Sequence, residues 1–191
     1  MTAEPVRTID IHGYAIVSDD DKIAAADGLT PVSLRNEKDW EYYQSALANS
    51  DLVVMARRSH ELEPNVRGDL RLVLSREGTG LEQRGDAWWW DPARVSWEEA
   101  VRRVLPGGGE VAVSGGQVAF DLFLAIGFEA FSLSRASGVK LPGGRGVFSR
   151  CDRGVPAATV LGDAGLFLAE TIPLDPEQGV TTNVWRRRKG T

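Results

Sequence analysis

The chain has 191 residues, of which 42% are hydrophobic and 26% are charged. These proportions are typical of a globular protein that is large enough to bury a core without disulfides or a structural metal. The formal net charge of −5 at pH 7 argues against a general binder of nucleic acid or of anionic membranes, because phosphate-rich surfaces attract cationic proteins.

The sequence shows no targeting segment and no metal motif. Residues 1–10, MTAEPVRTID, lack the basic start and apolar block of a secretory leader, and the longest apolar stretch, 120–131, is too short to cross a bilayer. Cys151 is the single cysteine, which excludes an internal disulfide framework and a cysteine-rich zinc site, and His12 and His60 are too isolated for a metal site. We therefore expect a cytoplasmic protein with no metal and with no membrane or nucleic-acid partner.

In the first half of the chain, short apolar runs predict strands and one periodic segment predicts a helix. The strands are expected at 11–17, 52–55 and 70–74, with a polar turn at 18–21 and a loop at 22–31. Between the first two strands, the segment 37–49 places Trp40, Tyr43 and Leu47 on one face of a helix. The fully apolar run at 52–55 is typical of a strand that is buried on both faces.

The next part of the chain alternates in the same way. Strands are expected at 87–90, 111–113 and 128–134, and helices at 97–104 and 117–126. Ser96 is a suitable N-cap for the first of these helices, and Glu99 can complete a capping box. In the strand 87–90, Trp88 and Trp90 share one face and Trp89 lies on the other. This predicts core packing on one side and a half-exposed or interface-facing ring on the other.

The end of the chain predicts antiparallel pairing. The segments 157–161 and 165–171 are expected to form a hairpin that turns at Gly162 and Asp163, with a further short strand at 181–185. Strands alternate with helices first and pair as a hairpin last. We therefore predict an α/β fold, a three-layer α/β/α sandwich whose central sheet is mostly parallel and ends in an antiparallel C-terminal hairpin. Residues 1–191 are expected to form a single domain.

A glycine pair marks the turn between the strand 111–113 and the helix 117–126. Such a turn can bind phosphate, because the first turn of a helix has free N–H groups and glycine permits close approach. Gly115 and Gly116 belong to neither a G-x-G-x-x-G nor a G-x-x-x-x-G-K-[ST] motif. Taken alone, the pair predicts a tight structural turn, and a phosphate seat is the alternative.

Four segments follow one another in an order that favours the phosphate seat. They are "YAIVSDDDKIAAADGLTPVSL" at 14–34, "DLVVMARRSHE" at 51–61, "LRLVLSRE" at 70–77 and "VAVSGGQVAFDLFL" at 111–124. Together they resemble the dihydrofolate reductase superfamily, which includes the reductase domain of the riboflavin-biosynthesis deaminase/reductase. The resemblance covers the chain from Gly13 to Phe148. It implies a dihydrofolate-reductase-like fold with NADPH lying across the carboxyl ends of the strands.

The resemblance also implies which residues hold the cofactor. Side chains around the adenosine 2′-phosphate would be those of Arg57, Arg58, Ser59, Ser75 and Arg76, since charge-assisted contacts bind a dianion strongly. Backbone N–H groups around the pyrophosphate would be those of Ser114, Gly115, Gly116, Gln117 and Val118. A cis bond between Gly115 and Gly116 is expected, because the family often has one there. The alternatives are a solvated surface pair for the two adjacent arginines and a strand-end cap for Ser75 and Arg76.

A carboxylate on the first helix is implied as the group that supports protonation of the substrate. Counting forward from Pro31 favours Glu37, whereas counting back from the strand 52–55 favours Asp39. We prefer Asp39, because the helix and the strand fix the register. The alternative is that Asp39 lies in the exposed first turn of its helix and only stabilises the helix dipole.

These expectations predict an NADPH-dependent reductase of a small heterocyclic substrate, pterin-like or aminouracil-like. The zinc deaminase motif of the riboflavin-type enzymes, H-x-E with P-C-x-x-C, is absent from the sequence. Val32 stands where the family has tryptophan, and Ala56 stands where it usually has glycine. Ala56 favours the alternative, a non-catalytic nucleotide- or protein-binding member of the same fold. The riboflavin-type relatives suggest a homodimer.

Overall fold

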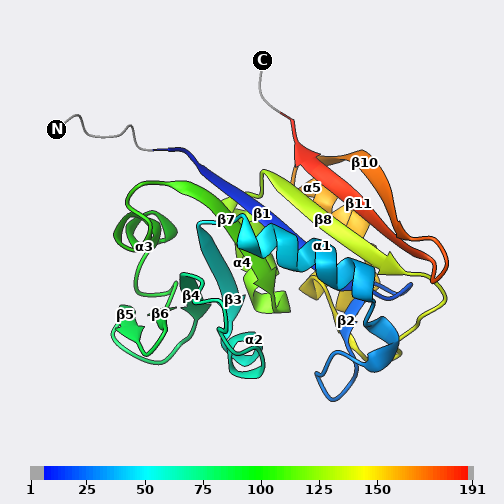
Figure 1. The fold of residues 1–191 in the computed structure, drawn as a ribbon, viewed down its shortest axis with the longest axis horizontal. Coiled ribbons are helices and arrows are strands. Elements are labelled where there is room, and N and C mark those ends of the chain that lie inside the picture. The colour runs from blue at the N-terminus through cyan, green and yellow to red at the C-terminus, as the bar shows by residue number, and fades with distance from the viewer. Residues whose placement is uncertain (1–6, 189–191) are drawn as a thin grey trace.

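The computed structural model describes residues 7–188. Its main feature is a nine-stranded sheet in the order β10-β11-β8-β1-β7-β3-β4-β6-β5 (Figure 1). The strands are β1 (Ile9–Val17), β3 (Leu52–Ala56), β4 (Arg71–Leu74), β5 (Leu81–Arg84), β6 (Ala87–Trp90), β7 (Gly109–Gly115), β8 (Ala130–Ala136), β10 (Leu166–Asp175) and β11 (Val180–Arg187). All neighbouring pairs from β8 to β6 are parallel, and the pairs at both edges are antiparallel. The predicted mostly parallel sheet is confirmed.

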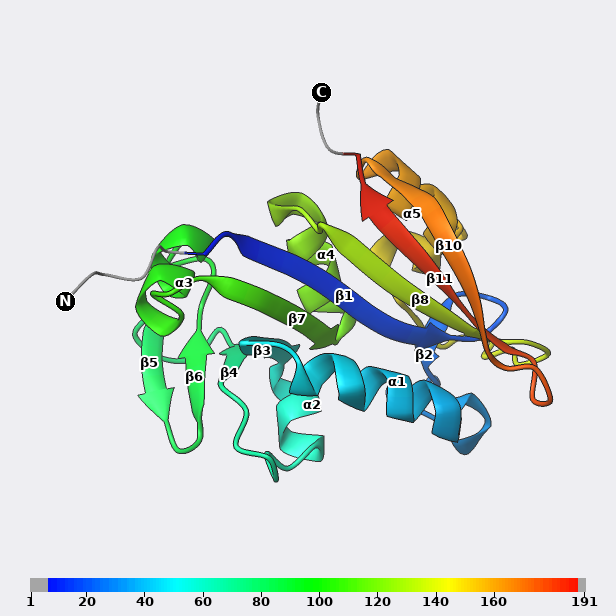
Figure 2. The ribbon, with the colours of Figure 1, turned by 45° about the horizontal axis from the view of Figure 1, so that its top comes forward.

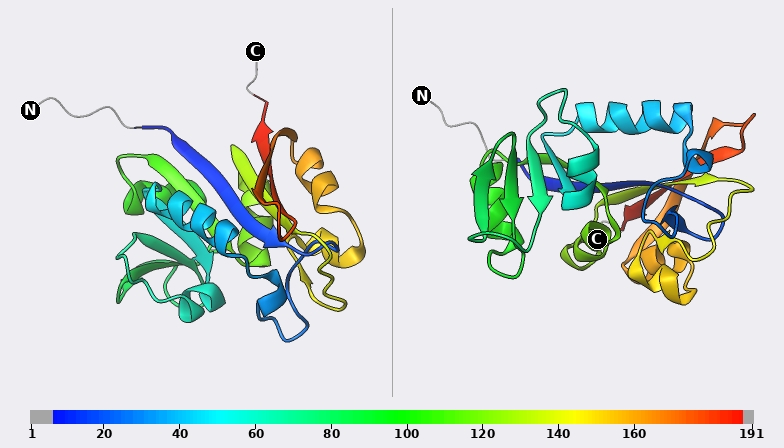
Figure 3. Two further views of the ribbon diagram at one scale, coloured as in Figure 1. Left: turned by 45° about the vertical axis from the view of Figure 1, so that its right-hand side comes forward. Right: turned by 90° about the horizontal axis from the view of Figure 1, so that it is seen from below.

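Helices cover both faces of the sheet, as Figures 2 and 3 show. One face carries α1 (Glu37–Ala48) and α2 (Arg57–Leu62), and the other carries α3 (Trp97–Val104), α4 (Gln117–Ile126) and α5 (Ala157–Asp163). The predicted three-layer sandwich is therefore confirmed. The hydroxyl of Ser96 caps α3 by accepting a hydrogen bond from the backbone N–H of Glu99 at 3.2 Å, which is the cap that the sequence predicts.

Alternate residues of the central strands pack against opposite layers. In β3, Leu52 and Val54 belong to the core under α3, α4 and α5, whereas Val53 and Met55 belong to the core under α1. All four are at most 1% exposed. Because successive strand residues point to opposite faces, a strand covered on both sides must be apolar throughout, as this one is.

The tryptophan run in β6 is packed on both faces of the sheet. Trp90 is buried, and its ring lies 5.7 Å from that of Trp97 and 6.4 Å from that of Phe123. Trp88 packs against the same core, while Trp89 packs on the α1 side. The predicted division of the three rings between the faces is confirmed, with Trp90 buried and Trp88 and Trp89 partly buried.

The predicted hairpin of 157–161 with 165–171 is wrong. Residues Ala157–Asp163 form α5, because Ala157, Val160 and Leu161 share one buried helix face. Gly165, with φ +85°, follows the end of this helix. The antiparallel C-terminal hairpin exists, but β10 pairs with β11 instead.

Several elements were not predicted. α2 starts directly after β3, β5 adds an edge strand, and β2 (Lys22–Ala24) pairs with β9 (Arg145–Gly146) in a small second sheet.

Residues 1–6 lie outside the described part of the chain, and most of the segment considered above for a secretory leader lies there. Within 7–188, no helix is long and apolar enough to cross a membrane. Nor does this part bring together three His, Cys, Asp or Glu residues that could hold a metal ion.

The acidic turn after β1 ties the neighbouring loops to the sheet. Asp19 accepts a hydrogen bond from the backbone N–H of Gly138 at 2.9 Å, and Asp20 accepts one from Leu141 at 3.0 Å. Asp21 has φ +59°, accepts from the N–H of Ala157 at 2.9 Å and pairs with Arg135. The three carboxylates therefore have structural partners and position the loops beside the strand ends.

Candidate functional site

The carboxyl ends of β3 and β7 meet at one edge of the sheet. The two strands are parallel neighbours, so the segments that follow them lie side by side. A methyl group added to Gly116 would lie 2.5 Å from the Cβ of Ala56, and one added to Gly115 would lie 3.7 Å from the hydroxyl oxygen of Ser59. Two of the segments that the resemblance assigns to the cofactor are therefore in contact.

The glycine pair turns without a cis peptide bond. No cis bond occurs in residues 7–188, so the expected cis bond between Gly115 and Gly116 is wrong. Instead, φ angles of +151° and +86° reverse the chain between β7 and α4. α4 has no side-chain cap, so its first N–H groups, including those of Gln117 and Val118, have no partner within the helix. These donors and the helix dipole can bind an anion.

A groove of about 600 Å³ opens beside the start of α4. Gln117 of α4, the loop after β2, α2 and the segments around β9 line it. Its charged lining residues are Lys22, Asp27, Arg58, Arg145 and Asp152. Cations outnumber carboxylates there, although the whole chain has a net charge of −5. The groove therefore suits an anionic ligand.

Arg58 lies in this groove, as the predicted cofactor site requires. Its Nη2 donates a hydrogen bond to the backbone oxygen of Asp27 at 3.3 Å. Its Nη1 is 2.7 Å from the position of a methyl group added to Gly28. The guanidinium thus bridges α2 and the loop after β2 and closes one side of the groove.

Arg57 is held outside the groove by two carboxylates. Its Nη1 lies 2.5 Å from Oε1 of Glu77, and its Nε lies 3.4 Å from Oε1 of Glu61. All three side chains are about half exposed or more, with 47%, 67% and 57% of their areas accessible respectively. Arg57 is therefore a paired surface residue, which is the alternative that the sequence left open.

The end of β4 also differs from the phosphate site that the resemblance implies. Ser75 is buried, and its hydroxyl accepts a hydrogen bond from the backbone N–H of Glu77 at 3.1 Å. Ser75 therefore caps the strand end. Arg76 is exposed, and it has no carboxylate within 4.0 Å in the described part of the chain. Of the side chains expected around the 2′-phosphate at this strand end, Arg76 is the one that remains available.

A polar cluster at the groove was missed by sequence reasoning. Nζ of Lys22 lies 3.1 Å from Oδ1 of Asp152, and Nε2 of Gln117 donates to Oδ2 of Asp152 at 2.7 Å. Burial alone would raise the pKa of Asp152, but the hydrogen bonds from Gln117, Gly146 and Lys22 outweigh it and lower the pKa. Lys22 and Asp152 are 130 residues apart, so no local pattern links them.

Asp39 faces the sheet from the first turn of α1. Its side chain is half-buried, and its backbone N–H donates to the side chain of the N-cap, Asn36, at 3.0 Å. Burial raises the pKa of this carboxyl, and the neighbouring Ser134 hydroxyl of β8 opposes the shift. Glu37 is exposed. Of the two candidate carboxylates, Asp39 is the one with an environment that can tune its protonation.

One turn further along α1, Tyr43 belongs to a polar group with Glu63 and Arg71. Burial raises the pKa of Tyr43 and also that of Glu63, its neighbour beyond α2. Arg71 of β4 is 5% exposed and donates from Nη1 to the backbone oxygen of Glu63 at 2.6 Å. Within 7–188 the Nε of Arg71 is buried without a hydrogen-bond partner. This group fixes α1 and the end of α2 over the sheet.

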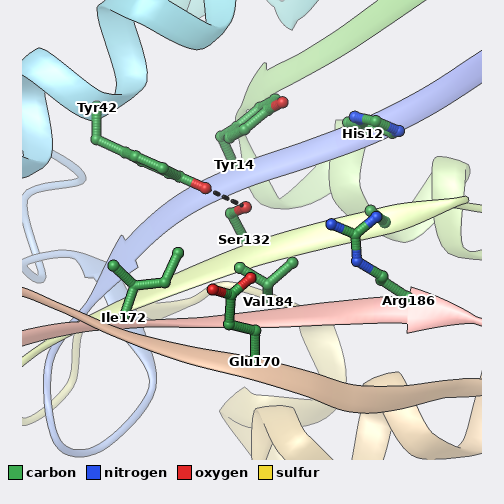
Figure 4. A pocket seen from close by; sticks show the side chains of 9 residues that line it. His12, Tyr14, Tyr42, Ser132, Glu170, Ile172, Val184 and Arg186 are labelled. Carbon is green, nitrogen blue, oxygen red and sulfur yellow. Dashed lines mark hydrogen bonds between the residues drawn. The ribbon is translucent and has the colours of Figure 1, made fainter.

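A second hollow, of about 270 Å³, lies on the α1 side of the sheet between α1, β8 and β10 (Figure 4). The hydroxyls of Tyr42 and Ser132 are 2.9 Å apart across it. Burial, together with Tyr42 and Glu110, raises the pKa of Tyr14 to about 12. Glu170 and Arg186 line the side formed by β10 and β11. None of the residues predicted to bind the cofactor lines this hollow.

No protein-family model matches the chain, and no curated protein matches its sequence. Solved structures do match its fold. A dihydrofolate reductase from Enterococcus faecalis complexed with NADP(H) and RAB-propyl has a TM-score of 0.67 at 14% identity, covering 94% of this chain and 97% of that one. A putative riboflavin biosynthesis protein from Shewanella sp. PV-4 has a TM-score of 0.66 at 14% identity, covering 95% and 100%.

A bifunctional protein shows the same likeness over part of its length. The diaminohydroxyphosphoribosylaminopyrimidine deaminase/5-amino-6-(5-phosphoribosylamino)uracil reductase of Thermotoga maritima has a TM-score of 0.66 at 15% identity. The match covers 95% of this chain and 57% of that one. The chain thus has the dihydrofolate-reductase-like fold that the ordered segments predict. At these identities the likeness establishes the fold, and the activity has to be argued from the site.

Proposed function

We propose that the chain is an NADPH-dependent reductase of a small heterocyclic substrate, pterin-like or aminouracil-like. The observation that carries the proposal is the uncapped start of α4 beside a basic groove at the strand ends. Free helix N–H groups bind a pyrophosphate, and Arg58 and Arg145 supply cations around it, while Lys22 is paired with Asp152. The Enterococcus faecalis structure of the same fold is complexed with NADP(H), which supports this choice of cofactor.

The chemistry divides between the cofactor and the chain. When bound, the dihydronicotinamide supplies a hydride to the substrate carbon, and a proton must reach the adjacent substrate nitrogen to complete the two-electron reduction. Asp39, directly or through a bound water, is the proposed proton source. Its raised pKa supports this role, because burial keeps the carboxyl protonated to a higher pH than an exposed aspartate would be.

A non-catalytic nucleotide-binding protein of the same fold is the second candidate. It is favoured by the Cβ of Ala56, which lies against Gly116 where the family usually has no side chain. Such a protein would bind the dinucleotide without transferring hydride. A homodimeric, cytoplasmic form remains the accompanying prediction for either function.

Arg58→Ala tests the proposed groove. Removing this guanidinium should weaken NADPH binding about tenfold, because a charge-assisted contact to phosphate is lost. The matched control is Arg103→Ala, since Arg103 is an exposed arginine on α3, away from the groove. NADPH affinity is measured by tryptophan fluorescence, and NADPH consumption is then followed with oxidised pterins and aminouracils. Binding without consumption of NADPH by any of them would favour the second candidate, and equal affinities of the two variants would argue against the groove.

A further inference from the structure

The charges after β3 and β4 are arranged unusually for a seat that is expected to bind a 2′-phosphate. The resemblance assigns Arg57, Arg58 and Arg76 to this phosphate, but Arg58 lines the groove beside α4, which leaves Arg57 and Arg76 at the strand ends. In the structure, Glu77 and Glu61 pair with Arg57 at 2.5 and 3.4 Å. Glu77 follows Arg76 directly, so a carboxylate lies at the strand end where the phosphate would be bound.

We propose that Glu77 is a specificity-determining residue that weakens the binding of a 2′-phosphate at the adenosine end of the cofactor seat, so that a free 2′-hydroxyl is also accepted there. The inference rests on the proposed cofactor function. Its consequence is that the chain discriminates only weakly between NADPH and NADH, although the resemblance assigns three arginines to the seat.

Two ion pairs reduce the charge that Arg57 offers to a phosphate. Nη1 and Nε of Arg57 are already paired with Glu77 and Glu61, so the charge that Arg57 can offer a phosphate is partly neutralised by two carboxylates. The backbone N–H of Glu77 is also engaged, because it donates to the hydroxyl of Ser75 at 3.1 Å. Ser75, which the resemblance also assigns to this phosphate, is buried and already accepts that hydrogen bond.

The Glu77 carboxylate would also repel a 2′-phosphate. A phosphate that reached Arg57 would come close to the Glu77 carboxylate, well inside the screening length of about 8 Å at physiological salt, so the like charges would repel. A ribose hydroxyl behaves in the opposite way, because it donates a hydrogen bond that a carboxylate accepts. A carboxylate on the ribose hydroxyl is the arrangement that favours NAD, whereas a nearby arginine favours NADP.

Glu77→Gln separates these effects from the fold. The side chain of Glu77 is 67% exposed, so the variant is expected to fold, which thermal unfolding checks. The matched control is Glu99→Gln, because Glu99 also pairs with an arginine, Arg102, on the surface helix α3. Affinities are measured for NADPH and NADH, and for the fragments 2′-AMP and adenosine, which report on this end of the cofactor alone.

The expected result is a gain of about tenfold in affinity for NADPH, equivalent to ~1.4 kcal/mol, with a similar relative gain for 2′-AMP over adenosine. NADH affinity should change less than about twofold or fall, and the NADPH gain should shrink at high salt. Glu99→Gln should change none of these values. If both cofactors bind but Glu77→Gln leaves their ratio unchanged, this inference is overturned and the proposed function stands. If neither cofactor binds to the wild type or to the variant, both are overturned.

Discussion

At the scale of single residues, Asp39 and Gly116 connect the local environment most directly to function. Asp39 is a half-buried carboxylate whose protonation is tuned by burial. Gly116 is a position where backbone geometry, and not a side chain, shapes the site. Asp39 leads to predictions for turnover and for stability, and Gly116 leads to a prediction for stability.

Asp39→Asn should lower turnover about 100-fold while leaving NADPH affinity unchanged, because the amide cannot donate the proton. In the wild type, turnover should fall as pH rises through the raised pKa of Asp39, since the protonated carboxyl is the active form. The variant should lack this limb of the pH profile. Steady-state rates across pH check this, and an unchanged profile in Asp39→Asn would assign the proton to another group.

The same substitution should not destabilise the protein at neutral pH. The folded-state pKa of Asp39 lies above its ordinary value of 3.8, so the folded state binds the proton more tightly than the unfolded state does. Its contribution to stability is therefore full below pH 3.8 and is lost as pH rises through the raised value. In urea unfolding, the stability of Asp39→Asn relative to the wild type should increase as the pH rises over this range.

Gly116→Ala should destabilise the protein by about 2 kcal/mol, because φ is +86° and the new methyl would lie 2.5 Å from the Cβ of Ala56. The control is Gly162→Ala in α5, where an added Cβ meets nothing within 4 Å and alanine favours the helix by up to about 1 kcal/mol. Denaturant unfolding measures both. Equal effects at the two sites would mean that the turn tolerates a side chain.

At the scale of elements, the acidic turn after β1 shows how a short segment positions the site. Asp21→Ala should cost about 2–3 kcal/mol, because the variant removes the carboxylate from Arg135, leaves the N–H of Ala157 without its acceptor and places alanine at φ +59°. Asp163→Ala, which breaks an exposed pair with Arg150, should cost less than about 0.5 kcal/mol. A comparable loss of stability in both variants, in thermal unfolding, would contradict the structural role of the turn.

Elements with local signals were predictable from sequence. α3 and α4 have the predicted bounds because Ser96 caps one and glycines flank the other. α5 was mistaken for a strand, because a short segment such as 157–161 fits either period and only packing decides between them. The Arg57–Glu77 pair and the Lys22–Asp152 pair were out of reach, since each joins residues that are distant in sequence. The sequence could therefore predict which segments of the site lie together. It could not predict which charged side chains form ion pairs there.

At the scale of the whole molecule, the parallel sheet explains why these segments meet. The strands β3, β4 and β7 run in the same direction, so the turns that follow them gather at one edge, where ligands bind in open α/β sheets. The chain has a formal net charge of −5, whereas three cations and two carboxylates line the groove beside α4. Both proposals depend on the binding of a dinucleotide at this edge of the sheet.

The measurement that tests this claim most directly is a titration of the folded wild-type protein with NADPH and, separately, with NADH, followed by quenching of its tryptophan fluorescence. Saturable binding of both is expected, with NADPH affinity about tenfold weaker in Arg58→Ala and unchanged in Arg103→Ala. Absence of saturable quenching by either cofactor, in protein whose folding is confirmed by thermal unfolding, would contradict this claim.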